Sequence, residues 1–285
     1  MTITIRGARA DDAGECGRIC YEAFHAIATA HNFPPDIPSV EAGIGALSGM
    51  LASAGVYGVV AEEDGRILGS NFLAEGDAVS GIGPITVDPT VQNKGVGALL
   101  MQAVMERSAA RRFAGMRLVQ AGYHMRSLSL YSKLGFDVRE HLSCMKGPAI
   151  NEAFDGYAVR PATVDDIDAC NAVCIAVHGF PRSGALRDAI ERGLALVVER
   201  DGRITGYATP IAFFAHAACE TTDDLKALIA AAPASQGPGF LVPSRNGALM
   251  RWCLAKGLKV TQSLTLMTTG LYSEPQGAWL PSILY

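Results

Sequence analysis

The chain has 285 residues, of which 49% are hydrophobic and 18% are charged, so it can form about two domains with large buried cores. Its formal net charge of −4 argues against nucleic acid or an anionic membrane as a partner. The sequence holds no apolar run near the ~18 residues of a membrane span, and it begins without a secretory signal pattern. Seven cysteines, an odd number without a CxxC pair, are typical of free thiols in a reducing compartment. We therefore expect a cytoplasmic protein.

Alternating apolar residues predict strands, a 3.6-residue apolar period predicts helices, and Gly, Pro and Asp-Gly mark the turns between them. In chain order, the first half is predicted to hold a strand (2–6), a helix from Asp11 or Asp12 to about Thr29, a helix (40–53), a hairpin (57–77), a strand (81–89), a helix (92–110), a strand (116–124), a helix (127–135) and a strand (136–145). We predict an α/β (α+β) fold, with a mixed, mostly antiparallel sheet and helices on both of its faces.

The two halves of the chain resemble each other in three blocks that occur in the same order. The matched blocks are 3–20 with 157–174, 59–69 with 197–206, and 130–147 with 252–270. Three ordered matches indicate tandem copies of one fold, because chance similarity between apolar strands would explain only one of them. The predicted domains are 1–148 and 157–285, joined by a linker at 147–156 that is rich in turn-forming residues.

The segment 87–108 reads as the end of a strand, a glycine-containing turn and a long helix. The turn is Gln92-Asn93-Lys94-Gly95-Val96-Gly97. The first N–H groups of a helix have no partner within the helix, and its dipole favours an anion at that end. A side chain at Gly95 or Gly97 would hold a phosphate away from these amides. The turn is therefore suited to a pyrophosphate.

The order V-x-P-x-x-Q-x-x-G-x-G at a helix start, followed by Y-x-K-L-G-F, resembles the GNAT superfamily of acyl-CoA-dependent N-acetyltransferases. The resemblance covers residues 1–148, and the repeat then implies two tandem GNAT-like domains. A P-loop would need G-x-x-x-x-G-K-[ST], which does not occur in this turn. A dinucleotide fingerprint would need G-x-G-x-x-G, whereas this turn begins with Gln-x-x-Gly.

The resemblance implies that acetyl-CoA is the co-substrate and that strands 81–89 and 116–123 grip its pantetheine arm. Backbone groups of one strand would bond the pantetheine amides, and the turn amides would hold the pyrophosphate. His124 stands where the family usually has Asn, and Ser127 stands where it usually has Ala. The implied coenzyme-binding set is Ile85, Thr86, Val87, Gln92, Asn93, Lys94, Gly95, Val96, Gly97, His124 and Ser127.

Acetyl transfer to an amine needs a neutral amine, N–H donors for the tetrahedral oxyanion and a proton for the departing thiolate. The resemblance places Tyr131 near the sulfur as the general acid; the alternative is a tyrosine that only packs its helix onto the sheet. The backbone N–H of Val87 is suited to the oxyanion if a bulge splays the strand.

The general base is left open by the sequence. Glu75 and Asp77 lie at the end of the hairpin strand, on the expected acceptor side, and Glu22 and His25 lie on the first helix. The alternative for each acid is a solvated surface charge, and for His25 it is a helix-face histidine that contacts the loop. The strand segment 81–83, where some family members carry a base, holds no acid. A base that acts through water is therefore an alternative.

The second copy lacks the Gln-x-x-Gly-x-Gly turn. We expect Thr222 or Asp223 to cap its matching helix, and Asp223 and Asp224 to repel a pyrophosphate. Cys253 stands at the position of Tyr131. The second copy is therefore expected to be a degenerate GNAT-like domain that binds no CoA.

These inferences predict a GNAT-type N-acetyltransferase that moves an acetyl group from acetyl-CoA to a primary amine of a small molecule, without a metal. Two alternatives stay open: a non-catalytic CoA-binding or regulatory module, and an interaction protein in which both copies are inactive. The identity of the acceptor and the oligomeric state, including a homodimer, are open as well.

Overall fold

The structure, a computed structural model, describes residues 3–235 and 237–284. The chain forms two compact units. The first is built mainly from residues up to 118 and from 123–135, and the second from 119–122 and 136–283. The units therefore do not coincide with the sequence copies, because the strand that ends the first copy lies in the second unit.

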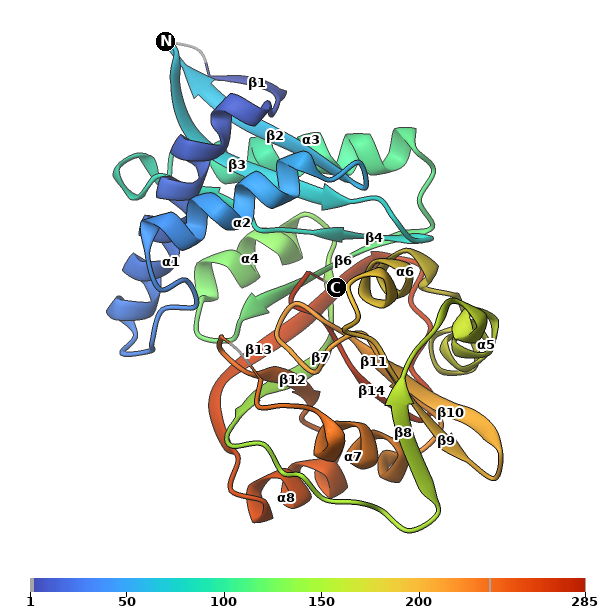
Figure 1. Cartoon of the computed structure of the whole chain (residues 1–285). Helices are drawn as coiled ribbons and strands as arrows, with labels where there is room; N and C mark the ends of the chain where they lie inside the picture. Colours follow the sequence, from blue (N-terminus) through green and yellow to red (C-terminus); the bar gives the residue numbers. More distant parts are fainter. Residues whose placement is uncertain (1–2, 236, 285) are drawn as a thin grey trace. The chain divides into compact units, whose positions relative to one another are not determined.

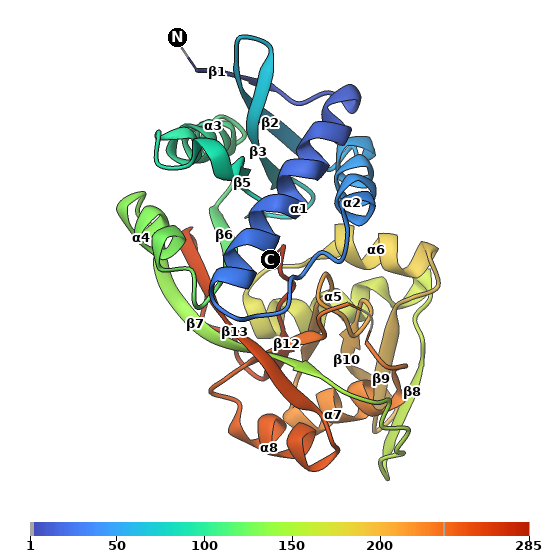
Figure 2. The ribbon, with the colours of Figure 1, turned by 90° about the vertical axis from the view of Figure 1, so that its left-hand side faces the viewer.

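Among the residues that the structure describes, the first unit contains six helical segments and most of one sheet. Its helices are η1 (Ala10–Asp12), α1 (Ala13–Ala30), α2 (Val40–Ala52), η2 (Pro89–Val91), α3 (Val96–Ala110) and the short α4 (Met125–Lys133). Its strands are β1 (Thr4–Gly7), β2 (Val56–Glu63), β3 (Arg66–Ala74), β4 (Val79–Ile82), β5 (Thr86–Val87) and β6 (Gly115–Ala121). Strand β6 ends in the second unit. Strand order is β1-β2-β3-β4-β6, and β5 pairs with β3. Only β4 and β6 are parallel in this set. Helices α1 and α2 cover one face of the sheet and α3 covers the other (Figure 2).

The hairpin at Asp64-Gly65 is confirmed. Both residues adopt positive φ, +50° and +79°, which is the backbone that a two-residue turn between twisted strands requires. The strand register pairs Glu63 with Arg66 directly across this turn. Apolar residues of α1, including Cys16 and Cys20, pack with Phe72 on the sheet and form the core of the unit.

The second unit holds the strand that ends the first copy and all of the second copy. Its elements are β7 (Asp137–Lys146), β8 (Tyr157–Pro161), η3 (Val164–Asp166), α5 (Ile167–His178), α6 (Ser183–Glu191), β9 (Leu196–Arg200), β10 (Arg203–Ala208), β11 (Ala217–Cys219), α7 (Thr222–Ala231), β12 (Phe240–Pro243), α8 (Gly247–Ala255), β13 (Lys259–Gly270) and β14 (Ala278–Leu280). One set of strands runs in the order β14-β11-β10-β9-β8, and β7 lies between β13 and β12 (Figure 1).

Alternating residues of this unit's strands face two cores. Tyr207 and Ala218 pack with residues of α5 and α6, whereas their neighbours Ala208 and Ala217 pack with residues of α7. Because successive strand residues point to opposite faces, α5 and α7 cover opposite faces of the sheet. In the part of the chain that the structure describes, no helix is long and apolar enough to cross a membrane.

The repeat is visible as one ion pair that occurs in both copies. Arg6 donates to Asp12 at 2.8 Å, and Arg160 donates to Asp166 at 2.7 Å. Each aspartate also accepts a backbone N–H three residues earlier, at 2.7 Å in both copies. The same arrangement therefore starts the first helix of each copy, at positions that the matched blocks align.

Candidate active site

The predicted turn follows β5 and begins at the buried carboxylate of Asp88. This carboxylate accepts hydrogen bonds from the Thr90 N–H at 2.8 Å and the Thr90 hydroxyl at 2.7 Å, and it pairs with Arg66 at 2.6 Å. Burial by itself would raise the pKa of Asp88, but the bonds from Thr90 and Arg66 lower it overall. The carboxylate therefore stays ionised and fixes the start of the turn.

Two residues of the turn adopt a left-handed backbone, Asn93 with φ +68° and Gly95 with φ +83°. These conformations delay the helix, so α3 begins at Val96 and the predicted start at residue 92 is wrong. The N–H groups of Ala98 and Leu99 donate to the carbonyl of Gly95. The N–H groups before Ala98 therefore lie at the open end of α3, where the helix dipole favours an anion.

Arg126, which the sequence analysis missed, holds the side chains of this turn. Its Nη2 donates to Oε1 of Gln92 at 2.7 Å, and its Nη1 lies 3.5 Å from Oδ1 of Asn93. The Gln92 amide in turn donates to the carbonyl of Val87 at 3.3 Å. The guanidinium is exposed, so it brings a positive charge to the open end of α3.

Beside the turn, alternate residues direct their backbone groups toward β3 and away from it. Pairing of β4 with β6 ends at Gly81–Arg117, and the following β5 pairs with β3 instead. Asp88 N–H donates to the carbonyl of Leu68. Because bonded and non-bonded positions alternate in an antiparallel pair, Thr86 bonds toward β3 while Val87 directs its N–H away from β3. By the same alternation Ile85 directs its backbone groups away from β3. Of the three predicted pantetheine contacts, Ile85 and Val87 therefore present backbone groups at the open edge.

His124 forms the N-cap of α4. Its Nδ1 accepts the Ser127 N–H at 3.2 Å, while the Ser127 hydroxyl donates to the His124 carbonyl at 2.8 Å. Burial, and to a smaller extent the charge of Arg126, lower the pKa of His124. With Nδ1 acting as an acceptor, the proton of the neutral ring is on Nε2. His124 is therefore an N–H donor at the start of the helix that carries Tyr131.

Tyr131 lies on α4 and is 6% exposed. Burial raises the pKa of its phenol well above the ordinary value. The phenol is consequently protonated at neutral pH, which is the state a general acid needs.

Two of the acids considered as bases, Glu75 and Glu22, are paired with arginines. Glu75 accepts two hydrogen bonds from Arg107, at 2.7 and 2.9 Å, which tie the end of β3 to α3. Glu22 pairs with Arg18 one helical turn away on α1. His25 is exposed, with its ring 5.4 Å from that of Tyr21. Asp77 is half-buried between β3 and β4.

In the second copy, the N-cap of α7 is Thr221, so the predicted cap at Thr222 or Asp223 is wrong. The Thr221 hydroxyl accepts the Asp224 N–H at 3.2 Å, and Asp224 accepts the Thr221 N–H at 2.9 Å. This capping box turns the fully buried Asp224 inward, where Arg200 lies 3.3 Å away. Only Asp223 remains exposed, and it pairs with Lys226 at 2.7 Å.

A strand from the end of the chain lies beside β11 of the second copy. Strand β14 pairs antiparallel with β11, with Trp279 opposite Ala218, and it also contacts β12 (Figure 1). In the repeat, β11 is the counterpart of the β4–β5 segment, because β11 precedes α7 and the β4–β5 segment precedes α3. Likewise β12 is the counterpart of β6, because β12 precedes α8 and β6 precedes α4. Strand β14 therefore occupies the place that corresponds to the predicted pantetheine position of the first copy.

Strand β14 packs tightly against its neighbours. A Cβ atom at Gly277 would lie 2.5 Å from the carbonyl oxygen of Cys219, so only glycine fits there. Trp279 is 5% exposed and packs edge-on against His178, with ring centroids 5.4 Å apart. The segment is thus part of the core of the second unit.

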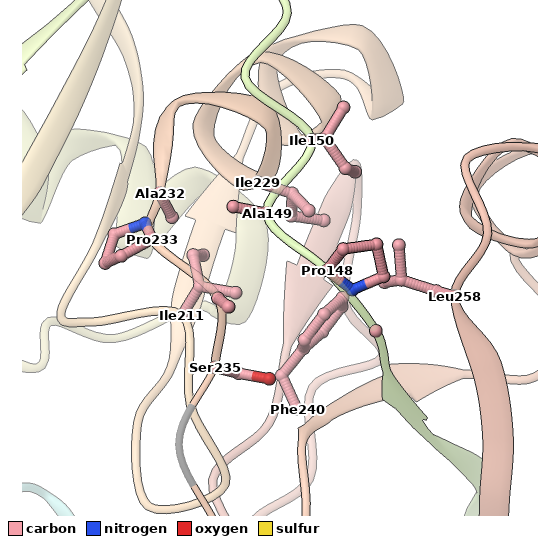
Figure 3. Close-up of a pocket in the computed structure, with 12 residues that line it drawn as sticks. Pro148, Ala149, Ile150, Ile211, Ile229, Ala232, Pro233, Ser235, Phe240 and Leu258 are labelled. Atoms are coloured by element: carbon pink, nitrogen blue, oxygen red, sulfur yellow. The ribbon is translucent and has the colours of Figure 1, made fainter.

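Two cavities lie in the second unit. One, of about 20 Å³ and lined by residues such as Pro148, Phe240 and Leu258 (Figure 3), has room for about one water molecule. The other, of about 290 Å³, lies between Trp279 and the starts of α7 and α8. There Asn246 caps α8 by accepting the Leu249 N–H at 3.1 Å, as His124 does in the first copy.

The described residues include no group of three or more His, Cys, Asp or Glu side chains placed to hold a metal ion. All seven cysteines are buried, and none of them forms a disulfide.

The fold and the turn define the class of protein. The chain matches the family model of the acetyltransferase (GNAT) domain over residues 54–138, and it therefore contains a GNAT domain. It is similar to the mycothiol acetyltransferase of Clavibacter michiganensis subsp. michiganensis, with 30% identity over 171 residues, 52% of this chain and 54% of that protein. The chain thus spans about half the length of this relative.

Two solved structures share the fold across nearly the whole chain. A protein of Pyrococcus horikoshii presented as a candidate acetyltransferase has a TM-score of 0.72 at 15% identity, covering 99% of this chain and 92% of that one. A tandem GNAT protein from the clavulanic acid biosynthesis pathway has a TM-score of 0.53 at 12% identity, covering 94% and 98%. At these identities the likeness shows the fold alone.

Proposed function

We propose that the first copy transfers an acetyl group from acetyl-CoA to a primary amine of a small molecule. The observation that carries this proposal is the open end of α3, where Gly95 and Gly97 leave the backbone amides accessible and Arg126 adds a positive charge. A Cβ atom added at Gly97 would meet only Leu130 and Val87, at 3.6 and 3.8 Å. The fold therefore tolerates a side chain at Gly97, and its absence suits a bound diphosphate.

The residues near this end provide the other requirements of acyl transfer. The N–H of Val87, directed away from β3, is placed to stabilise the oxyanion of the tetrahedral intermediate. Tyr131 supplies a proton to the departing CoA thiolate. His124 donates from Nε2 and helps to orient the coenzyme. The name of the matched relatives supports acetyl transfer; their acceptor is not carried over.

We infer that the second copy binds no coenzyme and has a structural role. Strand β14 fills the corresponding place, the glycine turn is missing, and Cys253 replaces Tyr131. The chain should then bind one acetyl-CoA. The buried cysteines, none of which forms a disulfide, are in keeping with a cytoplasmic location.

Two measurements test the proposal together. The first is calorimetric titration with acetyl-CoA, and the second is an assay of CoA release with a panel of primary amines. We expect one binding site per chain, at least tenfold weaker binding for Gly97→Ala at unchanged Tm, and release of CoA that depends on amine. Gly49→Ala, on the exposed side of α2 with no atom within 4 Å of the added Cβ, is the matched control. Binding without turnover of any amine would favour a non-catalytic module, and no binding would favour an interaction protein.

A further inference from the structure

Three rings stack where the connection between α1 and α2 meets the segment between β6 and α4. Tyr123 stacks on Phe33 with centroids 4.4 Å apart, and on His31 with centroids 5.2 Å apart. Phe33 and His31 belong to the α1–α2 connection, and Tyr123 directly precedes His124. Both views of the ribbon show this connection close to the start of α4 (Figures 1 and 2). The stack holds His31 beside the residues assigned to the coenzyme.

The hydrogen bond of His31 sets its tautomer. Nδ1 of His31 lies 2.9 Å from the carbonyl oxygen of Ile27. Since a carbonyl oxygen can only accept, Nδ1 carries the proton of the neutral ring and Nε2 carries the free lone pair. The side chain is exposed, so a lone pair on Nε2 is accessible to solvent and to an incoming amine.

His31 also lies where a positive charge is stabilised. It is the C-cap residue of α1, an 18-residue helix whose C-terminal carbonyl groups carry partial negative charge.

We propose that His31 is the general base of the amine acetylation proposed above. Two titratable groups lie near His31. The first is His124 at the start of α4, whose pKa the charge of His31 lowers slightly. The second is Tyr123, which lies near Asp36 of the α1–α2 connection. Burial, followed by the charge of Asp36, raises the pKa of Tyr123 to about 12. Tyr123 thus stays neutral and positions the His31 ring.

The proton transfers are divided between His31 and Tyr131. The ammonium group of the acceptor gives a proton to Nε2 of His31, and the neutral amine nitrogen then attacks the thioester carbonyl carbon. A C–N bond forms while the carbonyl π electrons move to oxygen. Collapse breaks the C–S bond, and Tyr131 protonates the thiolate and recovers a proton from the amide nitrogen. The products are the N-acetyl amine, CoA thiol and an imidazolium that returns its proton to water.

The test compares His31→Gln and His31→Ala with His141→Gln, an exposed histidine on β7 that has no assigned role. Amine-dependent release of CoA is measured across pH with alkylamine acceptors, and acetyl-CoA affinity is measured by calorimetry. For the His31 variants we expect kcat/KM to fall about 10²-fold at neutral pH with unchanged acetyl-CoA affinity. The loss should shrink at high pH, where the amine is already neutral, and added imidazole should partly rescue His31→Ala.

A His31→Gln variant within twofold of the wild-type rate would overturn this assignment, as would a loss that neither imidazole nor high pH repairs. These outcomes leave the proposed function intact if the wild type acetylates amines. A wild type that binds acetyl-CoA and acetylates no amine would refute the proposed function, and the base with it.

Discussion

Arg126 and Gln92 lie 34 residues apart in the chain, and their side chains join at 2.7 Å. This bond connects α4, which carries Tyr131, to the turn that precedes α3. Gln92 extends the connection to the carbonyl of Val87. The proposed phosphate site and the helix that carries Tyr131 are therefore connected through a few polar side chains of the first unit.

Replacing Arg126 by Ala should weaken acetyl-CoA binding about tenfold or more, because a hydrogen bond to a charged group contributes about 1.5–3 kcal/mol. The kcat at saturating coenzyme should change little. Calorimetric titration gives the Kd, and Lys133→Ala, on the same helix, is the control. Unchanged affinity in Arg126→Ala would show that the guanidinium serves only the fold.

Replacing Tyr131 by Phe should lower kcat about 10²-fold, the usual contribution of a general acid. The KM for acetyl-CoA and the Tm should stay near those of the wild type, since the buried ring is retained. Steady-state kinetics with Tyr57→Phe as a control provides the measurement. A rate within twofold of the wild type would remove Tyr131 from the mechanism.

Much of the first copy follows from local signals. The hairpin at Asp64-Gly65 and the helix over 40–53 are confirmed, because turn chemistry and apolar period act over few residues. The matched blocks also align Asp12 with Asp166, and the structure shows the same ion pair at both positions. The helix start at residue 92 failed because Asn93 and Gly95 adopt positive φ, and this depends on how the turn is held.

Features that depend on distant partners had no local signal. Arg126 is one exposed arginine among many, and its role comes from a residue 34 positions away. Strand β14 is three residues long and is defined by its pairing with β11. The position of β7 in the second unit likewise depends on strands more than ninety residues further on.

Asp12 should contribute to stability in a pH-dependent manner. The hydrogen bond from Arg6 is the largest of the influences that hold the pKa of this carboxyl below its ordinary value. The stabilisation is therefore fully present above the unfolded pKa of about 3.9 and is lost as pH falls through the lower folded value. We expect Asp12→Asn to cost about 1–2 kcal/mol at pH 7, a Tm decrease of about 2–8 °C.

Thermal melts of Asp12→Asn and of the control Asp11→Asn between pH 7 and pH 3 measure this effect. The Tm difference from the wild type should be constant down to about pH 5 and should shrink below that. A difference that stays the same at pH 3 would contradict the assigned ion pair.

A fragment that ends at residue 148 should fold poorly. In the whole chain β7 has partners on both edges, with Leu142 opposite Leu264 of β13 and Pro243 of β12. The fragment would leave both edges open, which favours aggregation. Size-exclusion chromatography and melting of the fragment provide the measurement. A monomer with the Tm of the full chain would show that the first copy is independent.

A crystal structure of the protein soaked with acetyl-CoA tests the central claim most directly. The account predicts one coenzyme per chain, with diphosphate oxygens within hydrogen-bond distance of backbone N–H groups in the turn 92–97 and with β14 still paired to β11. A coenzyme bound in the second copy, or a diphosphate held away from the start of α3, would contradict it.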